Sequence, residues 1–199
     1  MDKPNQNSFQ LADLLMEIKA CRLCAADLPL GPNPVVRAES SATILIAGQA
    51  PGTAVHKTSI PFNDPSGNRL RNWMGITNEQ FYDQSKVAIV PMGFCYPGKG
   101  KSGDLPPRKE CSQTWHQRLL KLLPNLELVL PIGQYAHAYY LGEQRKKNLT
   151  ETVKAWRDFS PQYIPLPHPS PRNNIWLKKN AWFELEVIPY LRRRIKTVI

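Results

Sequence analysis

Short apolar runs that end in glycine or proline are the feature that most limits what this 199-residue chain can fold into. The first run, Thr43 to Ala47, passes directly into Gly48-Gln49-Ala50-Pro51-Gly52. Similar runs occur at Val87 to Val90, Leu126 to Ile132 and Tyr163 to Leu166. Apolar runs of this length without polar alternation are typical of strands that are buried on both faces, as in a parallel sheet.

Helical patterns alternate with these runs. Leu11, Leu14, Leu15 and Ile18 have the spacing of an amphipathic helix. The alternation predicts an α/β fold, in which one three-layer domain over residues 1–199 has a central, mostly parallel, four-stranded sheet flanked by helices. The other predicted helices lie at Arg69 to Met74, Cys111 to Leu123, Tyr135 to Leu141 and Ile175 to Lys196.

The chain has four cysteines in two pairs. Cys21 and Cys24 form a C-x-x-C pair directly after the first predicted helix, whereas Cys95 and Cys111 are widely spaced. A C-x-x-C turn aims two sulfurs the same way, and an iron-sulfur cluster or a soft metal ion needs four thiolates at one point. The pattern therefore predicts a metal centre to which all four cysteines contribute.

Two other interpretations of the cysteines are open. Free cysteine is often simply buried, so the four thiols could be unrelated core residues. Disulfides are disfavoured because the polar start, Met1 to Gln10, does not resemble a secretory signal peptide. We therefore expect a reducing, cytoplasmic compartment, in which cysteine pairs more often hold metal. Zinc is compatible with the same spacing and is the alternative to an iron-sulfur cluster.

The charge balance points to a polyanionic partner. Lys and Arg number 26 against 16 Asp and Glu, which gives a net charge of +10 and a pI near 9.6. Nucleic acid is the commonest such partner of a basic protein, and an anionic membrane surface is the rival. No apolar run is long enough to cross a bilayer, so we expect no membrane insertion. The expected oligomeric state is a monomer. The basic C-terminal cluster, Arg192 to Lys196, is consistent with a solvated helix end.

Three loops carry side chains suited to chemistry. Gly48 to Gly52 can present backbone N–H groups to a ligand at the end of a strand. Ile60 to Gly67 offers an aromatic ring, an amide and a carboxylate, although ordinary turn chemistry explains the same residues. Leu166 to Asn174 holds a histidine between prolines and then an arginine with two asparagines.

Together these motifs resemble one family. GQAPG after the first run, HPSPRNN after the last and the cysteine spacing are similar to the uracil-DNA glycosylase superfamily, particularly its iron-sulfur branches from thermophilic prokaryotes. The resemblance covers the chain from about Cys21 to its end. It implies a monofunctional DNA glycosylase of base excision repair that hydrolyses the N-glycosidic bond of uracil or another deaminated base, with a structural 4Fe-4S cluster.

The resemblance also implies roles for individual residues. Asp64 would stabilise the sugar cation, and His168 would donate to the departing base, assisted by the backbone N–H groups of Gln49 and Ala50. Phe62 would stack on the flipped base, although a Phe in such a loop is also a common core residue. The residues expected to bind the DNA backbone or to enter the gap left by the base are Pro51, Gly52, Pro169, Ser170, Pro171, Arg172 and Asn173.

The chain departs from the family pattern at two positions. Pro91 stands where the iron-sulfur relatives have a base-reading asparagine, and Ala50 stands where the best-known members have an aspartate. Because proline offers neither an amide side chain nor an N–H, the base that is read stays open. Three alternatives follow: Asn63 substitutes for the asparagine, the base is one other than uracil, or the activity is weak. A non-catalytic nucleic-acid-binding protein with the same fold is the second hypothesis. A nucleotide-binding enzyme ranks last, because the Gly48 to Gly52 loop lacks the following Lys-Ser or Lys-Thr pair.

Overall fold

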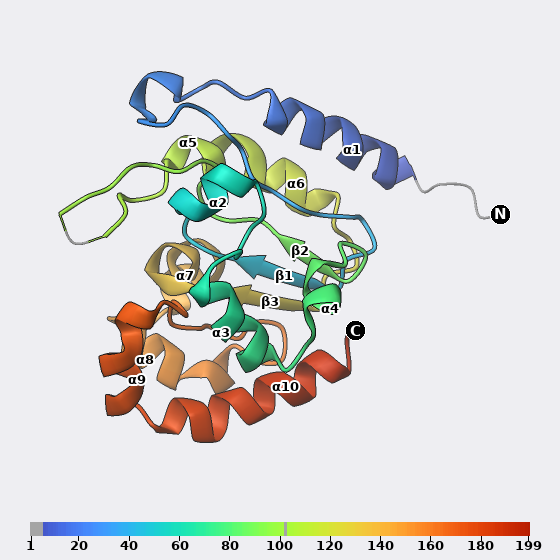
Figure 1. Cartoon of the computed structure of the whole chain (residues 1–199). Coiled ribbons are helices and arrows are strands. Elements are labelled where there is room, and N and C mark those ends of the chain that lie inside the picture. Colours follow the sequence, from blue (N-terminus) through green and yellow to red (C-terminus); the bar gives the residue numbers. More distant parts are fainter. Residues whose placement is uncertain (1–5, 102) are drawn as a thin grey trace.

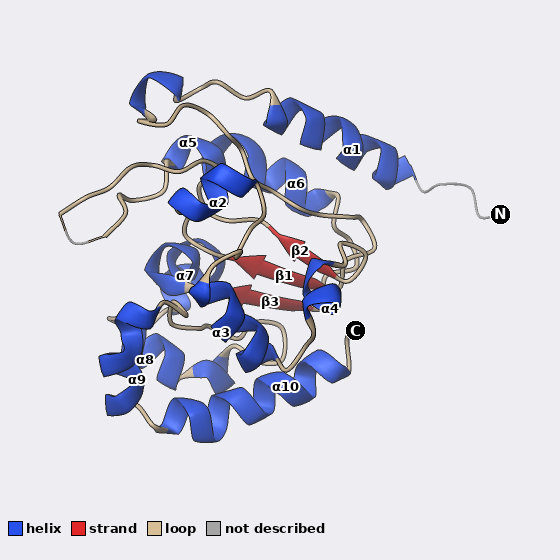
Figure 2. Cartoon of the chain, in the orientation of Figure 1, coloured by secondary structure: helices blue, strands red, loops and turns tan. Residues whose placement is uncertain are grey.

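The computed structural model describes residues 6–101 and 103–199 of the chain. Within them, β1 (Ile44–Ala47), β2 (Val87–Ile89) and β3 (Leu128–Pro131) form a parallel sheet in the order β2-β1-β3. Ile44 pairs with Val87 on one side and with Leu128 on the other. The three strands are the central layer in Figure 2.

The fourth predicted strand lies in its expected place but is not a regular strand. Tyr163 and Leu166 make isolated parallel bridges to Val129 and Ile132 beside β3. Ile164 donates to the carbonyl of Val129, and Leu166 donates to that of Pro131. Pro131 has no N–H to return between these bonds, so the ladder is interrupted. The prediction of a regular four-stranded sheet was therefore wrong by this one strand.

Helices surround the sheet and occupy more of the chain than the sequence patterns indicated. Short 3₁₀ turns at Ala25–Asp27, Gly142–Gln144, Trp156–Asp158 and Pro171–Asn173 join them, and two π-helical turns, Ser112–His116 and Phe183–Val187, precede α6 and α10. The α-helices are α1 (Gln6–Lys19), α2 (Thr53–Thr58), α3 (Pro65–Met74), α4 (Asn78–Tyr82), α5 (Lys109–Cys111), α6 (Gln117–Lys121), α7 (Gly133–Leu141), α8 (Leu149–Lys154), α9 (Asn174–Lys179) and α10 (Ile188–Lys196).

Most predicted helices are present, and one is broken. The amphipathic pattern over Leu11 to Ile18 is α1, with Leu11, Leu14 and Ile18 buried. The last predicted helix, Ile175 to Lys196, is interrupted at Asn180, so that prediction was wrong there. The Asn180 side chain donates to the carbonyl of Trp176 and accepts from the indole of Trp182, which replaces the helical hydrogen bonds.

The two faces of the sheet bury separate hydrophobic clusters. Ile44 and Ile46 point to the face that α3 and α10 cover, where they pack in one cluster with Leu70 and Leu191. The alternate residue Leu45 points to the other face and packs in a cluster built from α1 and the α5 to α6 segment. Figure 1 shows these helices on opposite sides of the strands. Helices on both faces confirm the predicted three-layer arrangement.

The loops that leave the sheet on its carboxyl side are positioned by the strands. β1 and β3 both end there, and the segment beside β3 continues from Leu166 toward His168. No helix among the described residues combines the length and the apolar character needed to cross a membrane.

Candidate active site

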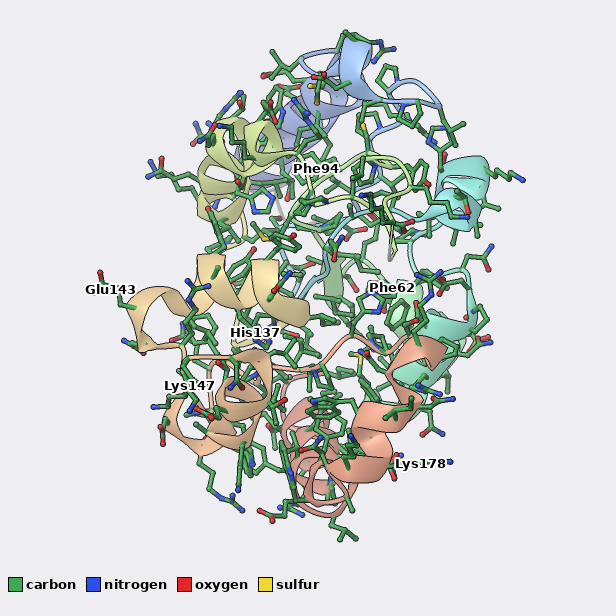
Figure 3. The ribbon with its side chains drawn as sticks, turned by 90° about the vertical axis from the view of Figure 1, so that its left-hand side faces the viewer. Phe62, Phe94, His137, Glu143, Lys147 and Lys178 are labelled. Carbon is green, nitrogen blue, oxygen red and sulfur yellow. The ribbon has the colours of Figure 1, made fainter. Side chains whose placement is uncertain are left out.

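A small pocket lies at the carboxyl edge of the sheet, and its volume is about 100 Å³. Segments that are far apart in the sequence converge on it, as expected where parallel strands end. Figure 3 views the molecule from this side and labels Phe62, which is part of the pocket wall. The residues that line the pocket are Val35, Gly48, Gln49, Ala50, Pro51, Gly52, Val55, Pro61, Phe62, Asp64, Ser66, Ile89, Pro91, Asp104 and His168.

The loop after β1 is fixed to the loop after β2. The carbonyl of Gly48 accepts from Met92 N–H at 2.8 Å, and that of Gln49 accepts from Gly93 N–H at 2.9 Å. The Gln49 side chain also donates to the carbonyl of Leu105 at 3.1 Å. In the part of the chain that the structure describes, the backbone N–H groups of Gln49 and Ala50 have no hydrogen-bond acceptor. They are therefore available to a ligand.

Phe62 is held in an unusual backbone conformation. Its φ is 55°, in the left-handed region that residues other than glycine rarely adopt. Its ring meets the ring of Phe81 edge-on at 6.0 Å, and it approaches Gly48 so closely that a Cβ there would lie 3.3 Å from the ring. Backbone strain of this kind is more common at functional sites than elsewhere. The ring is thereby fixed in the pocket wall beside the loop after β1.

Asp64 lines the pocket and is also the N-cap of α3. Its Oδ1 accepts from the Gly67 N–H at 2.9 Å and from the Ser66 hydroxyl at 2.5 Å. Proline at the first helical position and aspartate at the N-cap are both favoured there, which is why the helix begins where it does. Both of these bonds go to Oδ1. Oδ2 has no hydrogen bond among the described residues and is free to face a ligand.

His168 follows the fourth run and is half-buried in the pocket. Burial lowers the pKa of its imidazole, while the negative charges of Asp64 and Asp104 partly oppose that shift. The ring is thus neutral near pH 7. Nδ1 accepts from the Ser170 N–H at 3.2 Å, so the single proton of the neutral ring is on Nε2. His168 can therefore donate one hydrogen bond from Nε2.

The residues after His168 form a loop outside the pocket that several hydrogen bonds hold in place. Ser170 caps the turn Pro171–Asn173 by accepting from the Arg172 N–H, and Asn173 donates to the carbonyl of His168 at 2.7 Å. Arg69 donates to the carbonyl of Ser170 at 3.0 Å. The Arg172 side chain is exposed, and its guanidinium lies 3.3 Å from where a Cβ on Gly103 would be.

Most of the predicted site residues meet in the pocket, and some do not. Gln49, Ala50, Phe62, Asp64 and His168 all line it, as do Pro51 and Gly52, which were expected to contact DNA. Asn63, the expected substitute for a base-reading asparagine, is exposed and is not among the lining residues. Pro169 to Asn173 also lie outside the pocket, on the loop that follows it.

Sequence reasoning missed two polar residues of the pocket, Ser66 and Asp104. Ser66 is buried and holds the carboxylate of Asp64. Asp104 comes from a glycine-rich hairpin between the third and fourth cysteines, and nothing in its local sequence distinguishes it from a turn residue. Its place in the pocket depends on the hairpin that carries it back over Gly52.

Pro91 lines the pocket, and its carbonyl accepts a hydrogen bond from a buried histidine. The buried imidazole of His116 donates from Nε2 to that carbonyl at 3.1 Å and stacks on Phe94 at 5.3 Å. Burial lowers the pKa of His116 to about 4, so this donor is neutral at pH 7. The loop after β2 is therefore rigid where the family pattern has a base-reading side chain.

The four cysteines line a second cavity, of about 10 Å³, together with Arg22, Leu23, Leu28, Pro32, Pro34 and Phe94. All four are free thiols. Across residues 6–101 and 103–199, no group of three or more His, Cys, Asp or Glu side chains is arranged to hold a single metal ion. The two halves of the cysteine pattern, some 70 residues apart in the sequence, nevertheless reach one place.

The surroundings of the cysteine cavity suit sulfur ligands. The Phe94 N–H donates to Cys111 Sγ at 3.4 Å, and the Asn33 N–H interacts with Cys95. Burial raises the pKa of Cys95 to about 11 and that of Cys111 to about 12. Neutral thiols are thus favoured until a cation binds, and the N–H donors are the kind that stabilise thiolates bound to iron. Cysteine sulfurs with N–H donors beside them are the donor type that iron-sulfur clusters use.

A third hollow, of about 330 Å³, continues from the active-site pocket. It shares Gln49 and Asp104 with the pocket and extends past Lys101 to Gln134 and Tyr135 at the start of α7. A pocket that accepts one small ligand therefore opens onto a longer surface along the carboxyl edge.

This arrangement, a parallel sheet whose carboxyl edge combines a carboxylate, a neutral imidazole donor and an aromatic wall, suits an α/β protein that binds a planar, polar ring. Comparison with known families identifies the class. The family model of the uracil DNA glycosylase superfamily matches residues 36–192, and the chain belongs to that superfamily. Membership supports a DNA glycosylase-type function on a DNA substrate. The matched range contains the whole active-site pocket apart from Val35, and it contains Cys95 and Cys111 but not the C-x-x-C pair.

Proposed function

We propose that this protein hydrolyses the N-glycosidic bond of uracil or another deaminated base in DNA. The observation that carries the proposal is the convergence of Asp64, His168 and Phe62 on one small pocket at the carboxyl edge of the sheet. The pocket is too small for a duplex, so the target nucleotide must leave the base stack, at a cost of a few kcal/mol. The ring of Phe62 offers the flipped base a face to stack on.

The two polar groups suit the two charges of the transition state. As the bond breaks, its electron pair leaves with the base, and positive charge grows on the sugar. The free Oδ2 of Asp64 would stabilise that cation, while the Nε2 proton of His168 would stabilise the anionic oxygen of the base. Water then bonds to the sugar C1′ and loses a proton, and the base takes up a proton.

The surface around the pocket suits a nucleic-acid strand. The net charge is +10, and the neighbouring hollow includes Lys101. We propose that the loop Pro169 to Asn173 meets the backbone and that Arg172, which is exposed beside the pocket hairpin, enters the gap left by the base. Phosphate contacts make such binding strongly dependent on salt and largely independent of sequence.

We further propose that Cys21, Cys24, Cys95 and Cys111 hold a 4Fe-4S cluster, with zinc as the less favoured occupant. The shared cavity and the backbone N–H donors to sulfur support this. The cluster would tie the N-terminal segment to the Cys95 to Cys111 loop, which is a structural task. We also propose that the protein acts as a monomer in the cytoplasm, where reducing conditions keep thiols free to bind metal.

The decisive experiment uses anaerobically purified protein and labelled oligonucleotides that contain uracil, hypoxanthine or xanthine, each single-stranded and paired. Excision leaves abasic sites that break under alkali. We expect cleavage of at least one of these substrates and its loss in Asp64→Asn. Folded, cluster-replete protein that cleaves none of them would overturn the proposal.

A non-catalytic nucleic-acid-binding protein is the second candidate. Pro91 and Ala50 favour it, because each stands in the pocket wall without the side chain that the family pattern places there. Tight binding to abasic or single-stranded DNA without turnover would support this candidate over the enzyme.

A further inference from the structure

Some polar side chains of the pocket already make hydrogen bonds within the described part of the protein, and one does not. Ser66 is occupied with Asp64, and the Gln49 amide donates to Leu105. Nδ1 of His168 is occupied by Ser170. By contrast, the carboxylate of Asp104 has no hydrogen bond and no ion pair among the residues that the structure describes. It is the one carboxylate at the pocket with neither oxygen in use.

A tight hairpin positions this carboxylate. Leu105 N–H donates to the carbonyl of Gly98 at 2.8 Å, and Lys99 and Asp104 face each other in an antiparallel bridge. Gly98 has a φ of 108°, a conformation that favours glycine. The carboxylate reaches back over the loop after β1, because Asp104 Oδ2 lies 3.7 Å from where a Cβ on Gly52 would be.

The carboxylate faces the same space as His168. Asp104 lines the pocket wall together with that imidazole, and its negative charge acts to raise the pKa of both His168 and Tyr96. The pocket therefore presents an acceptor, Asp104, in addition to the Nε2 donor of His168. Pro91, which lines the pocket just after β2, has neither a side-chain amide nor an N–H, so it offers a ligand no hydrogen-bond donor.

We propose that Asp104 is the specificity-determining residue of the glycosylase reaction, and that it selects bases whose ring carries an N–H beside a carbonyl. The inference rests on the proposed function. Deamination of cytosine and of adenine creates this N–H–C=O group in uracil and in hypoxanthine, and xanthine has it as well. An ionised carboxylate accepts hydrogen bonds only, so it pairs with the ring N–H while His168 donates to an adjacent carbonyl.

The same carboxylate rejects cytosine and adenine, the parent bases of uracil and hypoxanthine. Cytosine and adenine have an unprotonated ring nitrogen where the deaminated bases have N–H, and its lone pair would face the carboxylate oxygens. Loss of one hydrogen bond and repulsion between two acceptors both act against binding. Asparagine at this position would remove the discrimination, because its amide can donate to the ring nitrogen of cytosine or accept from that of uracil.

The test compares Asp104→Asn and Asp104→Ala with wild type and with Asp13→Asn, an exposed carboxylate on α1. Matched oligonucleotides carry uracil or cytosine at one site, and kcat/KM is measured for each. We expect the uracil-to-cytosine ratio to fall about tenfold or more in Asp104→Asn, with a gain of cytosine excision, and Asp104→Ala to lose activity on uracil. Asp13→Asn should match wild type.

A second measurement separates this inference from the proposed function. The variant Asp64→Asn, in which excision is slowed so that binding can be measured before cleavage, is titrated with the same oligonucleotides, and binding is followed by fluorescence anisotropy. We expect a preference for uracil that disappears when Asp104→Asn is added. An unchanged uracil-to-cytosine ratio in a folded, active Asp104→Asn variant would overturn the role of Asp104. Absence of excision by wild type, with the binding preference intact, would instead overturn only the catalytic function.

Discussion

The Ser170 N–H donates a hydrogen bond of 3.2 Å to Nδ1 of His168. The backbone N–H of Ser170, two residues after the histidine, therefore sets the tautomer of the ring, because an Nδ1 that accepts a hydrogen bond leaves the proton on Nε2. Asn173 fixes the same loop through the carbonyl of His168. The donor that faces the pocket is thus prepared before any ligand enters.

We expect nuclear magnetic resonance to find His168 neutral, with its proton on Nε2, at pH 7. Burial is the main cause of its lowered pKa, and Asp64 and Asp104 act in the opposite direction. Removing either negative charge should therefore lower the pKa further. The ¹⁵N and ¹³C shifts of the imidazole, followed by pH titration of wild type, Asp64→Asn and Asp104→Asn, measure this. A pKa that rises in either variant would contradict the assigned electrostatics.

Asp64 has two separable tasks, and its variants should separate them. Asparagine is as good an N-cap as aspartate, so Asp64→Asn should keep α3 intact while it removes the charge. We expect the excision rate to fall about 100-fold or more, which is typical when one preorganised electrostatic group is lost. Thermal unfolding should change little.

The matched control is Asn148→Ala, which removes the N-cap of α8 away from the pocket. Both Asp64→Ala and Asn148→Ala should cost about 1 kcal/mol of stability. Only the former should reduce excision. Equal loss of activity in both variants would show that Asp64 acts through helix stability alone.

The fold was predictable because hydrophobic periodicity reports burial directly. Ile44, Leu45 and Ile46 alternate between two packed faces, and α1 buries the residues that its spacing indicated. The interruption of the fourth strand and the break in the last helix could not be predicted in the same way. Hydrogen bonds of single residues decided both: Pro131 lacks a donor, and Asn180 bonds to neighbouring tryptophans.

The candidate site was predictable to the extent that it follows strand ends. Phe62, Asp64 and His168 come from motifs with a fixed place in the chain order, and all three line one pocket. Asp104 could not be found, because its position depends on how a hairpin folds back over Gly52. Asn63 was expected in the pocket, but the left-handed backbone of Phe62 and the N-cap at Asp64 leave its side chain exposed.

Gly67 should be essential to the geometry of the aromatic wall. A Cβ at this position would lie 1.7 Å from the carbonyl oxygen of Phe62, so Gly67→Ala must displace the turn that carries Phe62 and Asp64. We expect a loss of stability greater than 2 kcal/mol, roughly the effect of strain plus a lost cap, together with loss of excision. Gly142→Ala is the control, because φ is 53° there but nothing lies within 4 Å. A smaller effect in Gly67→Ala than in Gly142→Ala would contradict the close contact.

The buried histidines should make stability fall in mild acid. Burial lowers the pKa of His116 and of His137 from 6.5 to about 4. Between these values the unfolded chain binds protons that the folded chain does not, so the free energy of unfolding decreases as the pH falls from 6.5 to 4. Each histidine contributes at most about 1.4 kcal/mol per pH unit. Denaturant titrations in this range measure the slope.

Glutamine at either position can still donate to the same carbonyls but does not titrate. His137 Nε2 contacts the carbonyls of Pro131 and Leu166 at 3.1 Å, and a glutamine amide can reach similar partners. We therefore expect His116→Gln and His137→Gln each to reduce the slope below pH 6.5. Above that range the curves of variants and wild type should run parallel. An unchanged slope in both variants would mean that other groups cause the acid sensitivity.

Arg108 should hold the C-x-x-C segment and the segment before Cys111 together. Its guanidinium donates to Asp27 at 2.8 Å, just after the C-x-x-C pair, and to Glu110 at 2.6 Å, just before Cys111. It also interacts with the Cys24 side chain. The Arg108 side chain is only 32% exposed, but ion pairs of this kind are worth about 1 kcal/mol at most, so we expect Arg108→Ala to fold with slightly lower stability.

The larger effect should appear in the metal centre, since the proposed cluster needs both cysteine pairs held together. We expect Arg108→Ala to lose iron to a chelator several-fold faster than wild type, measured by the decay of visible absorption and by iron content per chain. Arg118→Ala is the matched control, because Arg118 pairs with Glu17 at 2.8 Å between α6 and α1, outside the cysteine cavity. Equal rates of iron loss in the two variants would contradict the proposed role of Arg108. A colourless, iron-free wild type that binds zinc would instead overturn the proposal of an iron-sulfur cluster.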